Sequence, residues 1–98
     1  MDDPDDPLVT EDSVPSYSVI EEKIKEIDNA IIIYRVYYLF NTFTFRFQLI
    51  KKDKMCVLEI PRALLESLNK DGSTSERELL QILNLNIENE ECWADLKG

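Results

Sequence analysis

Hydrophobic and polar residues alternate strictly over residues 43–49. The apolar members are Phe43, Phe45, Phe47 and Leu49, and the polar members are Thr44, Arg46 and Gln48. A period of two is typical of a strand with one buried face and one solvated face. A lysine-rich turn at 51–54 follows, and a second alternating run covers 55–60. Together the two runs predict a β-hairpin whose aromatic face packs against another layer.

The segment before the hairpin changes character near Asn29. Ile20, Ile24 and Ile27 recur at helical spacing, so we expect a helix over 16–28. Residues 31–40 are rich in β-branched and aromatic side chains, which favour a strand. A heptad reading allows one long helix over 18–40 instead. We favour helix then strand because the composition changes abruptly and the hairpin needs a neighbouring strand.

Helical signals follow the hairpin. Pro61 suits the first turn of a helix over 61–71, and Gly72 suits its C-cap. Ser75 and Glu78 have capping-box spacing and predict a second helix over 75–85. The resulting α-β-β-β-α-α order predicts an α+β fold, a three-stranded antiparallel meander with helices packed on one face.

The net negative charge comes from the two ends of the chain. Of the net charge of -9, residues 1–15 contribute six acidic and no basic side chains, together with three of the four prolines. Such a segment cannot form a packed core, so we expect 1–15 to be a disordered acidic tail and 16–98 to be a single α+β domain. The middle of the chain is close to neutral.

The composition argues against an enzyme and against a bound cofactor. The chain has no histidine and only two glycines, so histidine-based catalysis, histidine-ligated metals and glycine-rich phosphate loops are all excluded. Two isolated cysteines cannot build a zinc site. The hairpin aromatics alternate with Arg46 and face the core, so we do not expect a nucleic-acid partner.

Two cysteines, Cys56 and Cys92, lie in apolar patterns without a CxxC spacing. We expect buried free thiols in a cytoplasmic protein, although a disulfide between them stays open because spacing alone does not decide pairing. The N-terminus lacks the basic and apolar regions of a signal peptide. The longest apolar stretch, 30–40, contains Arg35 and is too short to span a bilayer, so we expect no membrane partner.

The first predicted strand is apolar on both faces. One face carries the candidate interaction residues Ile32, Tyr34, Val36, Tyr38 and Phe40. As an edge strand, it promotes aggregation unless a helix or a partner covers it. We therefore predict a non-enzymatic protein-interaction module that binds another protein or forms a homodimer through strand 31–40.

Two alternatives remain. The size and net charge also fit an acidic inhibitor or nucleic-acid mimic of the kind that phages and mobile elements encode. A weaker alternative is a calcium-responsive helix-loop-helix. Residues 67–78 partly resemble an EF-hand loop, although Ser67 replaces the opening aspartate. The matching positions are Asn69, Asp71, Gly72, Ser75 and Glu78. A plain linker between two helices explains the same residues.

Overall fold

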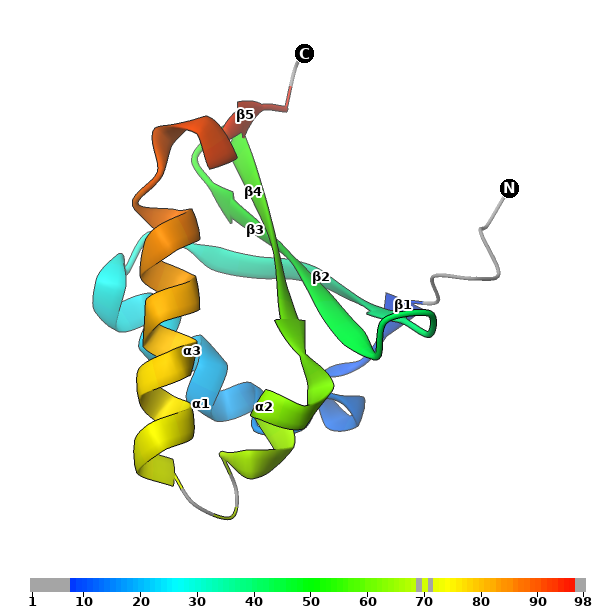
Figure 1. Ribbon diagram of the computed structural model, residues 1–98. Coiled ribbons are helices and arrows are strands. Elements are labelled where there is room, and N and C mark those ends of the chain that lie inside the picture. Colours follow the sequence, from blue (N-terminus) through cyan, green and yellow to red (C-terminus); the bar gives the residue numbers. More distant parts are fainter. Residues whose placement is uncertain (1–7, 69, 71, 97–98) are drawn as a thin grey trace.

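The computed structural model describes residues 8–68, 70 and 72–96 (Figure 1). The strands are β1 (Leu8–Val9), β2 (Ile32–Leu39), β3 (Thr44–Lys51), β4 (Lys54–Pro61) and β5 (Ala94–Asp95). The α-helices are α1 (Tyr17–Ile27), α2 (Arg62–Ser67) and α3 (Gly72–Ile87), and two 3-10 turns are η1 (Glu11–Ser13) and η2 (Glu90–Cys92). None of the described helices combines the length and apolarity needed to cross a membrane.

The five strands form one antiparallel sheet in the order β1-β2-β3-β4-β5. The predicted meander is confirmed as its centre, and a strand of two residues is added at each edge. The preference for helix then strand is also confirmed, because α1 ends at Ile27 and β2 begins at Ile32. Asp28 shapes the connection, since its side chain accepts a hydrogen bond from the Ala30 backbone N–H at 3.0 Å.

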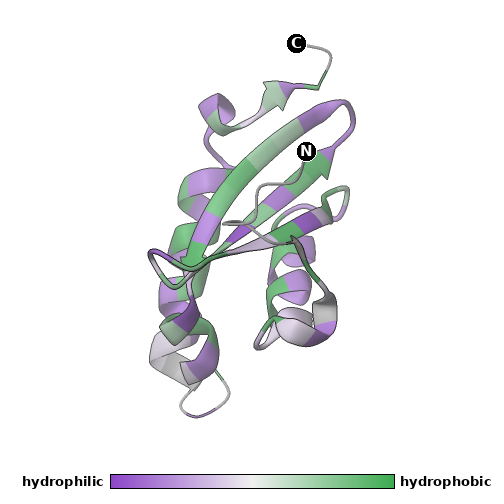
Figure 2. Ribbon diagram, turned by 90° about the vertical axis from the view of Figure 1, so that its right-hand side faces the viewer, coloured by the Kyte–Doolittle hydropathy of each residue, from purple (hydrophilic) through white to green (hydrophobic). Residues whose placement is uncertain are grey.

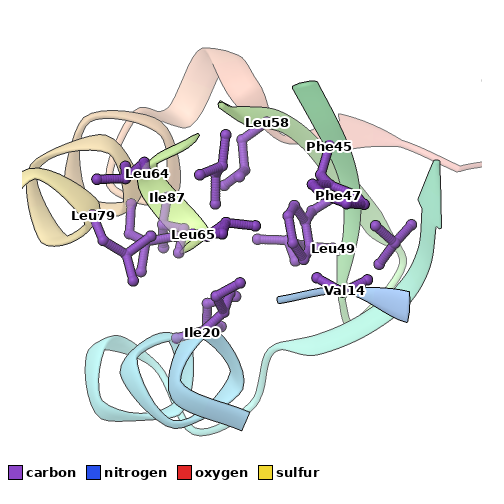
Figure 3. Packing of buried hydrophobic residues seen from close by; sticks show 14 of the residues in the cluster. Val14, Ile20, Phe45, Phe47, Leu49, Leu58, Leu64, Leu65, Leu79 and Ile87 are labelled. Carbon is purple, nitrogen blue, oxygen red and sulfur yellow. The ribbon is translucent and has the colours of Figure 1, made fainter. Parts of the chain in front are cut away.

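The core lies between one face of the sheet and the helices (Figure 3). Phe45 and Phe47 of β3 pair with Ile60 and Leu58 of β4, so their side chains line the same inner face. The helices bury Ile20 and Ile24 of α1, Leu64 and Leu65 of α2, and Leu79 and Leu83 of α3 against it. The alternation behind this arrangement is visible in the hydropathy colours along the strands (Figure 2). The prediction of helices on one face is therefore confirmed.

The junction between α2 and α3 differs from the prediction. The second helix starts at Gly72 rather than at residue 75, so Gly72 does not cap α2 and Ser75 is not an N-cap. Ser75 is instead buried in α3, and its hydroxyl lies 2.9 Å from the Ser67 hydroxyl, to which it donates. Ser67 in turn donates to the Ala63 carbonyl at 3.0 Å. Ser75 therefore links α3 to α2 instead of capping the start of α3.

Part of the segment expected to be a tail pairs with the sheet and packs into the core. We call residues 8–15 the N-terminal strap. Its first two residues pair with Tyr37 and Val36 of β2, and Val14 is only 4% exposed within the core. Acidic composition predicted a tail here, but Val9 and Val14 pack against the core, and their burial offsets part of the cost of ordering the strap. The rest of the predicted tail, residues 1–7, lies outside the described residues.

Cys56 and Cys92 form a disulfide, so the expectation of free thiols was wrong. Their Cα atoms are 5.0 Å apart although 36 residues separate them in sequence. The pairing of β4 with β5 brings the C-terminal segment beside β4, next to buried Cys56. Trp93 also fixes this segment, because its indole N–H donates to the Ile87 carbonyl at 2.8 Å.

The disulfide generates a stability prediction. Reducing it should lower the free energy of unfolding by about 2–4 kcal/mol, because the unfolded chain regains the freedom of a long loop. Urea unfolding with and without a phosphine reductant measures this difference. Cys92→Ser is the control, since its unfolding should be insensitive to the reductant. Alkylation of both cysteines in the unreduced, unfolded chain would contradict the disulfide.

The strap generates a second prediction. Val14→Ala should destabilise the fold by about 1–3 kcal/mol, because it removes buried methyl groups and leaves a cavity. Val57→Ala makes the same chemical change at a site that is 41% exposed, and it should cost less than about 1 kcal/mol. Thermal or urea unfolding compares the two variants. Equal losses would show that the strap does not contribute to the core.

Candidate binding site beside the N-terminal strap

The five predicted interaction residues do not share one face of β2. Ile33 pairs with Leu49 and Arg35 pairs with Gln48, so Tyr34 is an extra residue at a β-bulge. A bulge reverses the facing of all side chains beyond it. The predicted set is therefore divided: Ile32 and Tyr34 are exposed, Val36 and Tyr38 are buried, and Phe40 follows the end of the strand and is exposed. The prediction that all five form one surface was wrong.

Two members of that set, Tyr38 and Phe40, meet in a cavity of about 240 Å³ beside the strap. We call this cavity the aromatic pocket. The remaining lining residues come from the strap, β3 and the start of α2: Val9, Ser13, Pro15, Phe45 and Arg62. Most of these residues were not predicted from the sequence, because the strap falls within the segment expected to be a disordered tail. The available signal was the apolar pair Leu8-Val9 and the isolated Val14 within the acidic segment.

Three aromatic rings form the apolar wall of the pocket. The Tyr38 ring lies 5.0 Å from the Phe40 ring in an edge-to-face arrangement and 4.8 Å from the Phe45 ring, centroid to centroid. Tyr38 and Phe45 are buried, whereas Phe40 is 56% exposed. Phe40 is therefore the ring with the most surface left for a ligand.

Phe43, which the alternating pattern placed in the core, lies outside the pocket and is 66% exposed. It precedes β3 in a left-handed conformation with φ of 51°, so the strand periodicity does not extend to it. Its carbonyl accepts the Arg62 backbone N–H at 2.9 Å. The backbone of this turn thus helps to position the first residue of α2.

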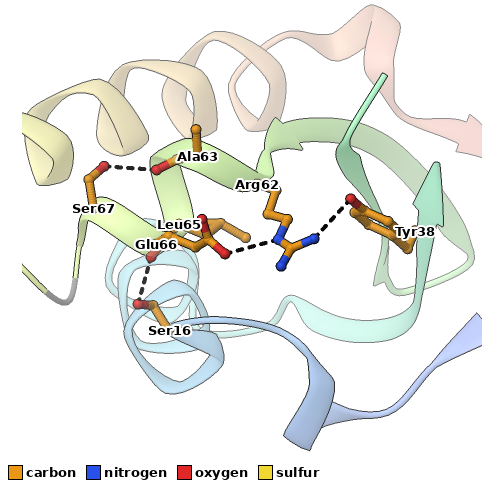
Figure 4. A network of polar contacts seen from close by, with 7 residues as sticks. All are labelled: Ser16, Tyr38, Arg62, Ala63, Leu65, Glu66 and Ser67. Carbon is orange, nitrogen blue, oxygen red and sulfur yellow. Dashed lines mark hydrogen bonds and ion pairs between the residues drawn. The ribbon is translucent and has the colours of Figure 1, made fainter. Parts of the chain in front are cut away.

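Arg62 contributes a positive charge to the lining of the aromatic pocket, and Figure 4 shows its guanidinium between Glu66 and Tyr38. Its Nε donates to the Glu66 carboxylate at 2.9 Å, and its Nη1 donates to the Tyr38 hydroxyl at 3.3 Å. The hydrogen bonds to Tyr38 and Glu66 raise the pKa of Arg62 above its ordinary value. A guanidinium carries five N–H donors, so these two bonds leave donors for a further acceptor. The site can therefore hold an apolar group with an adjacent carboxylate.

A second cavity, which we call the polar hollow, is also lined by Val9 and measures about 440 Å³. It lies along the part of the β2 edge with which β1 does not pair. The lining residues are Val9, Thr10, Asp12, Tyr17, Ile33, Tyr34, Arg35 and Val36. Arg35 lies over the Tyr34 ring at 4.7 Å and donates to the Tyr37 hydroxyl at 3.5 Å. The hydrogen bond to the Tyr37 hydroxyl is the main cause that raises the pKa of Arg35 above its ordinary value, and the electrostatic interaction with Tyr34 adds to it.

Lys51 connects α1, β3 and the C-terminal segment. Its ammonium lies 2.7 Å from the Asp28 carboxylate and 5.6 Å from the centre of the Trp93 ring. The Lys51 hydrogen bond and the Ala30 backbone N–H lower the pKa of Asp28. Lys51 and Asp28 also line a neighbouring cavity of about 290 Å³. The charge of Lys51 in that cavity is already paired with Asp28. This arrangement serves to hold the three segments together.

Metal-binding geometry is not found in the part of the chain that the structure describes. No group of three or more histidine, cysteine, aspartate or glutamate side chains there is placed to hold an ion. Ser75 and Glu78 of the EF-hand pattern lie within the regular helix α3 rather than in a loop. Asn69 and Asp71 of the same pattern lie outside the described residues.

Comparisons with protein-family models, curated proteins and solved structures found no match.

Asp28 allows a prediction of pH dependence. Because its folded-state pKa is depressed, its ionised form stabilises the fold above the ordinary value of 3.8, and that stability is lost as the pH falls through the lower folded value. Asp28→Asn keeps an acceptor for Ala30 but removes the charge. The variant should therefore lose less stability than the wild type between about pH 4 and pH 2.

Thermal melts over this pH range measure the effect. Asp53→Asn, in the β3–β4 turn, is the matched control, because Asp53 forms no ion pair with any other described residue. The control should retain the acid sensitivity of the wild type. Equal acid sensitivity in the Asp28 variant would contradict the role of the Lys51 contact.

Proposed function

We propose that this protein is a non-enzymatic interaction module that binds a partner protein through the aromatic pocket. An apolar side chain of the partner enters between Phe40 and the strap, and a carboxylate next to that side chain pairs with Arg62. The observation that carries the proposal is an open aromatic wall with a positioned guanidinium at its rim.

The size of the pocket supports a side chain rather than a cofactor. Small-molecule sites usually measure about 300–1,000 Å³, and this pocket is smaller, at about 240 Å³. Aromatic residues and arginine are also the residue types that contribute most often to the energetic centres of protein interfaces. A single apolar anchor inserted beside Phe40 is the occupant that fits both features.

The charge at the rim selects the chemistry beside the anchor. Arg62 disfavours a cationic group, and its spare N–H donors suit a carboxylate. Glu66 already neutralises part of this charge at 2.9 Å. Because this ion pair is solvent-exposed, a partner carboxylate gains only a modest free energy, on the order of 1 kcal/mol. The apolar anchor therefore supplies most of the affinity, and the carboxylate supplies the orientation.

The aromatic pocket revises the predicted interaction surface. Tyr38 and Phe40 retain a role as walls of the pocket, while buried Val36 belongs to the core. The acidic-mimic alternative finds less support, because several folded-region carboxylates are committed to internal ion pairs. These are Asp28, Glu59, Glu66 and Glu76. We infer that the pocket, rather than net charge, directs recognition.

The disulfide bears on the compartment in which binding takes place. The sequence led us to expect a cytoplasmic protein with free thiols. Disulfides persist in oxidising compartments and are rare in the cytosol. The Cys56–Cys92 bond thus supports a proposal that the protein acts in an oxidising compartment.

The proposal is tested with two probes that differ only in the carboxylate. N-acetyl-L-phenylalanine carries an aromatic side chain and a carboxylate, and N-acetyl-L-phenylalanine amide lacks the charge. In NMR titrations of the full chain, the acid should shift the signals of Tyr38, Phe40 and Phe45 and should bind more tightly than the amide. Millimolar dissociation constants are expected for probes with so few atoms.

Matched variants identify the groups responsible. Phe40→Ala should weaken the acid about tenfold, whereas Phe43→Ala, on the same turn but outside the pocket, should not. Arg62→Gln should remove the preference for the acid over the amide, and Arg46→Gln should preserve it. Unchanged binding in Phe40→Ala, or probe shifts confined to other residues, would overturn the proposal.

A further inference from the structure

The polar hollow has a volume in the range of small-molecule sites. Its volume of about 440 Å³ lies within the range usual for such sites, unlike that of the aromatic pocket. Apolar side chains from two elements form part of its wall, namely Val9 of β1 and Ile33 and Val36 of β2. This cavity shares Val9 with the aromatic pocket but is otherwise lined by different residues.

Two opposite charges line this hollow without neutralising each other. Asp12 of the strap and Arg35 of β2 both contribute to its wall, and neither forms an ion pair with any described residue. Two unpaired charges of opposite sign in one cavity can be satisfied together by a ligand that carries both complementary charges.

The arginine is already positioned for such a ligand. The Tyr34 ring supports one face of the Arg35 guanidinium at 4.7 Å, and the Tyr37 hydroxyl accepts from its Nη1 at 3.5 Å. These contacts reduce the freedom that the side chain would otherwise lose on binding. The bulge at Tyr34 creates the arrangement, because it places consecutive Tyr34 and Arg35 side chains on the exposed part of β2.

We propose that the polar hollow binds a small zwitterion of the amino-acid class, either a free amino acid or a short peptide. Its carboxylate pairs with Arg35, its ammonium group pairs with Asp12, and its apolar side chain lies against Val9 and Ile33. Binding involves no covalent step.

The same charges disfavour other ligands. Asp12 repels a simple anion, and Arg35 repels a simple organic cation. A metal ion would need several oxygen ligands, and the described residues offer no such group. The apolar lining further favours a ligand with a hydrocarbon side chain over a purely polar one.

Four probes separate the contributions of the two charges. L-leucine carries both charges, N-acetyl-L-leucine lacks the ammonium group, L-leucinamide lacks the carboxylate, and leucyl-leucine separates the two charges by a longer distance. Calorimetric and NMR titrations of the full chain should show that a zwitterion binds at least about tenfold more tightly than either singly charged probe. The tighter of L-leucine and leucyl-leucine identifies the spacing that the site prefers.

Charge-neutralising variants test the assignment of each group. Asp12→Asn should weaken the zwitterion about tenfold and leave N-acetyl-L-leucine unaffected or bound more tightly. Arg35→Gln should show the reverse pattern, with L-leucinamide spared. Asp53→Asn and Arg77→Gln are matched controls outside the hollow and should bind like the wild type. Amide NMR spectra verify that each variant is folded.

The outcomes either support or overturn the proposal. Zwitterion-selective binding with NMR shifts at Ile33, Tyr34 and Arg35, lost in the two hollow variants, supports it. Equal affinity for charged and neutral probes overturns it, as does equal loss in the control variants. Shifts confined to Tyr38, Phe40 and Phe45 also overturn it, since they would assign the probe to the aromatic pocket.

Discussion

The burial of the inner face of the β3–β4 hairpin is the constraint on which the rest of the structure depends. Phe47, Leu49 and Ile60 are almost completely removed from water, and each helix contributes aliphatic side chains that cover them. Burial on this scale is the main favourable contribution to folding. Because the hairpin is antiparallel and only one of its faces carries these residues, the helices are confined to one side of the sheet.

The strap completes this core where the helices do not reach. Val14 packs into the same cluster as the helical residues, and Ser16, the residue directly after the strap, donates a side-chain hydrogen bond to the Leu65 carbonyl at 2.9 Å. The strap therefore links the edge of the sheet to α2. Both candidate cavities lie against it and share Val9 as a lining residue. A segment whose acidic composition predicted a disordered tail thus forms part of each proposed site.

The central strands and α1 could be predicted because the spacing of hydrophobic residues, every second residue in a strand and every third or fourth in a helix, is set by the local sequence alone. The features that were missed depend on partners distant in sequence. The Tyr34 bulge is defined by the register with β3, the disulfide by the approach of β5 to β4, and the strap by its pairing with β2. For the same reason the sequence indicated Tyr38 and Phe40 of the aromatic pocket but gave no indication of Arg62. No local pattern indicates that Arg62 approaches the Tyr38 hydroxyl.

The two outermost strands, β1 and β5, are each only two residues long. Long, flat, apolar edges act as templates on which other chains add strands and grow into fibrils. Here the sheet ends on one side in a short strand beside a bulge, and on the other in a segment tied down by a disulfide. The chain also carries a net charge of -9, which keeps copies apart in solution. The short outer strands, the bulge and the net charge all oppose the addition of a further strand at the edges of this sheet.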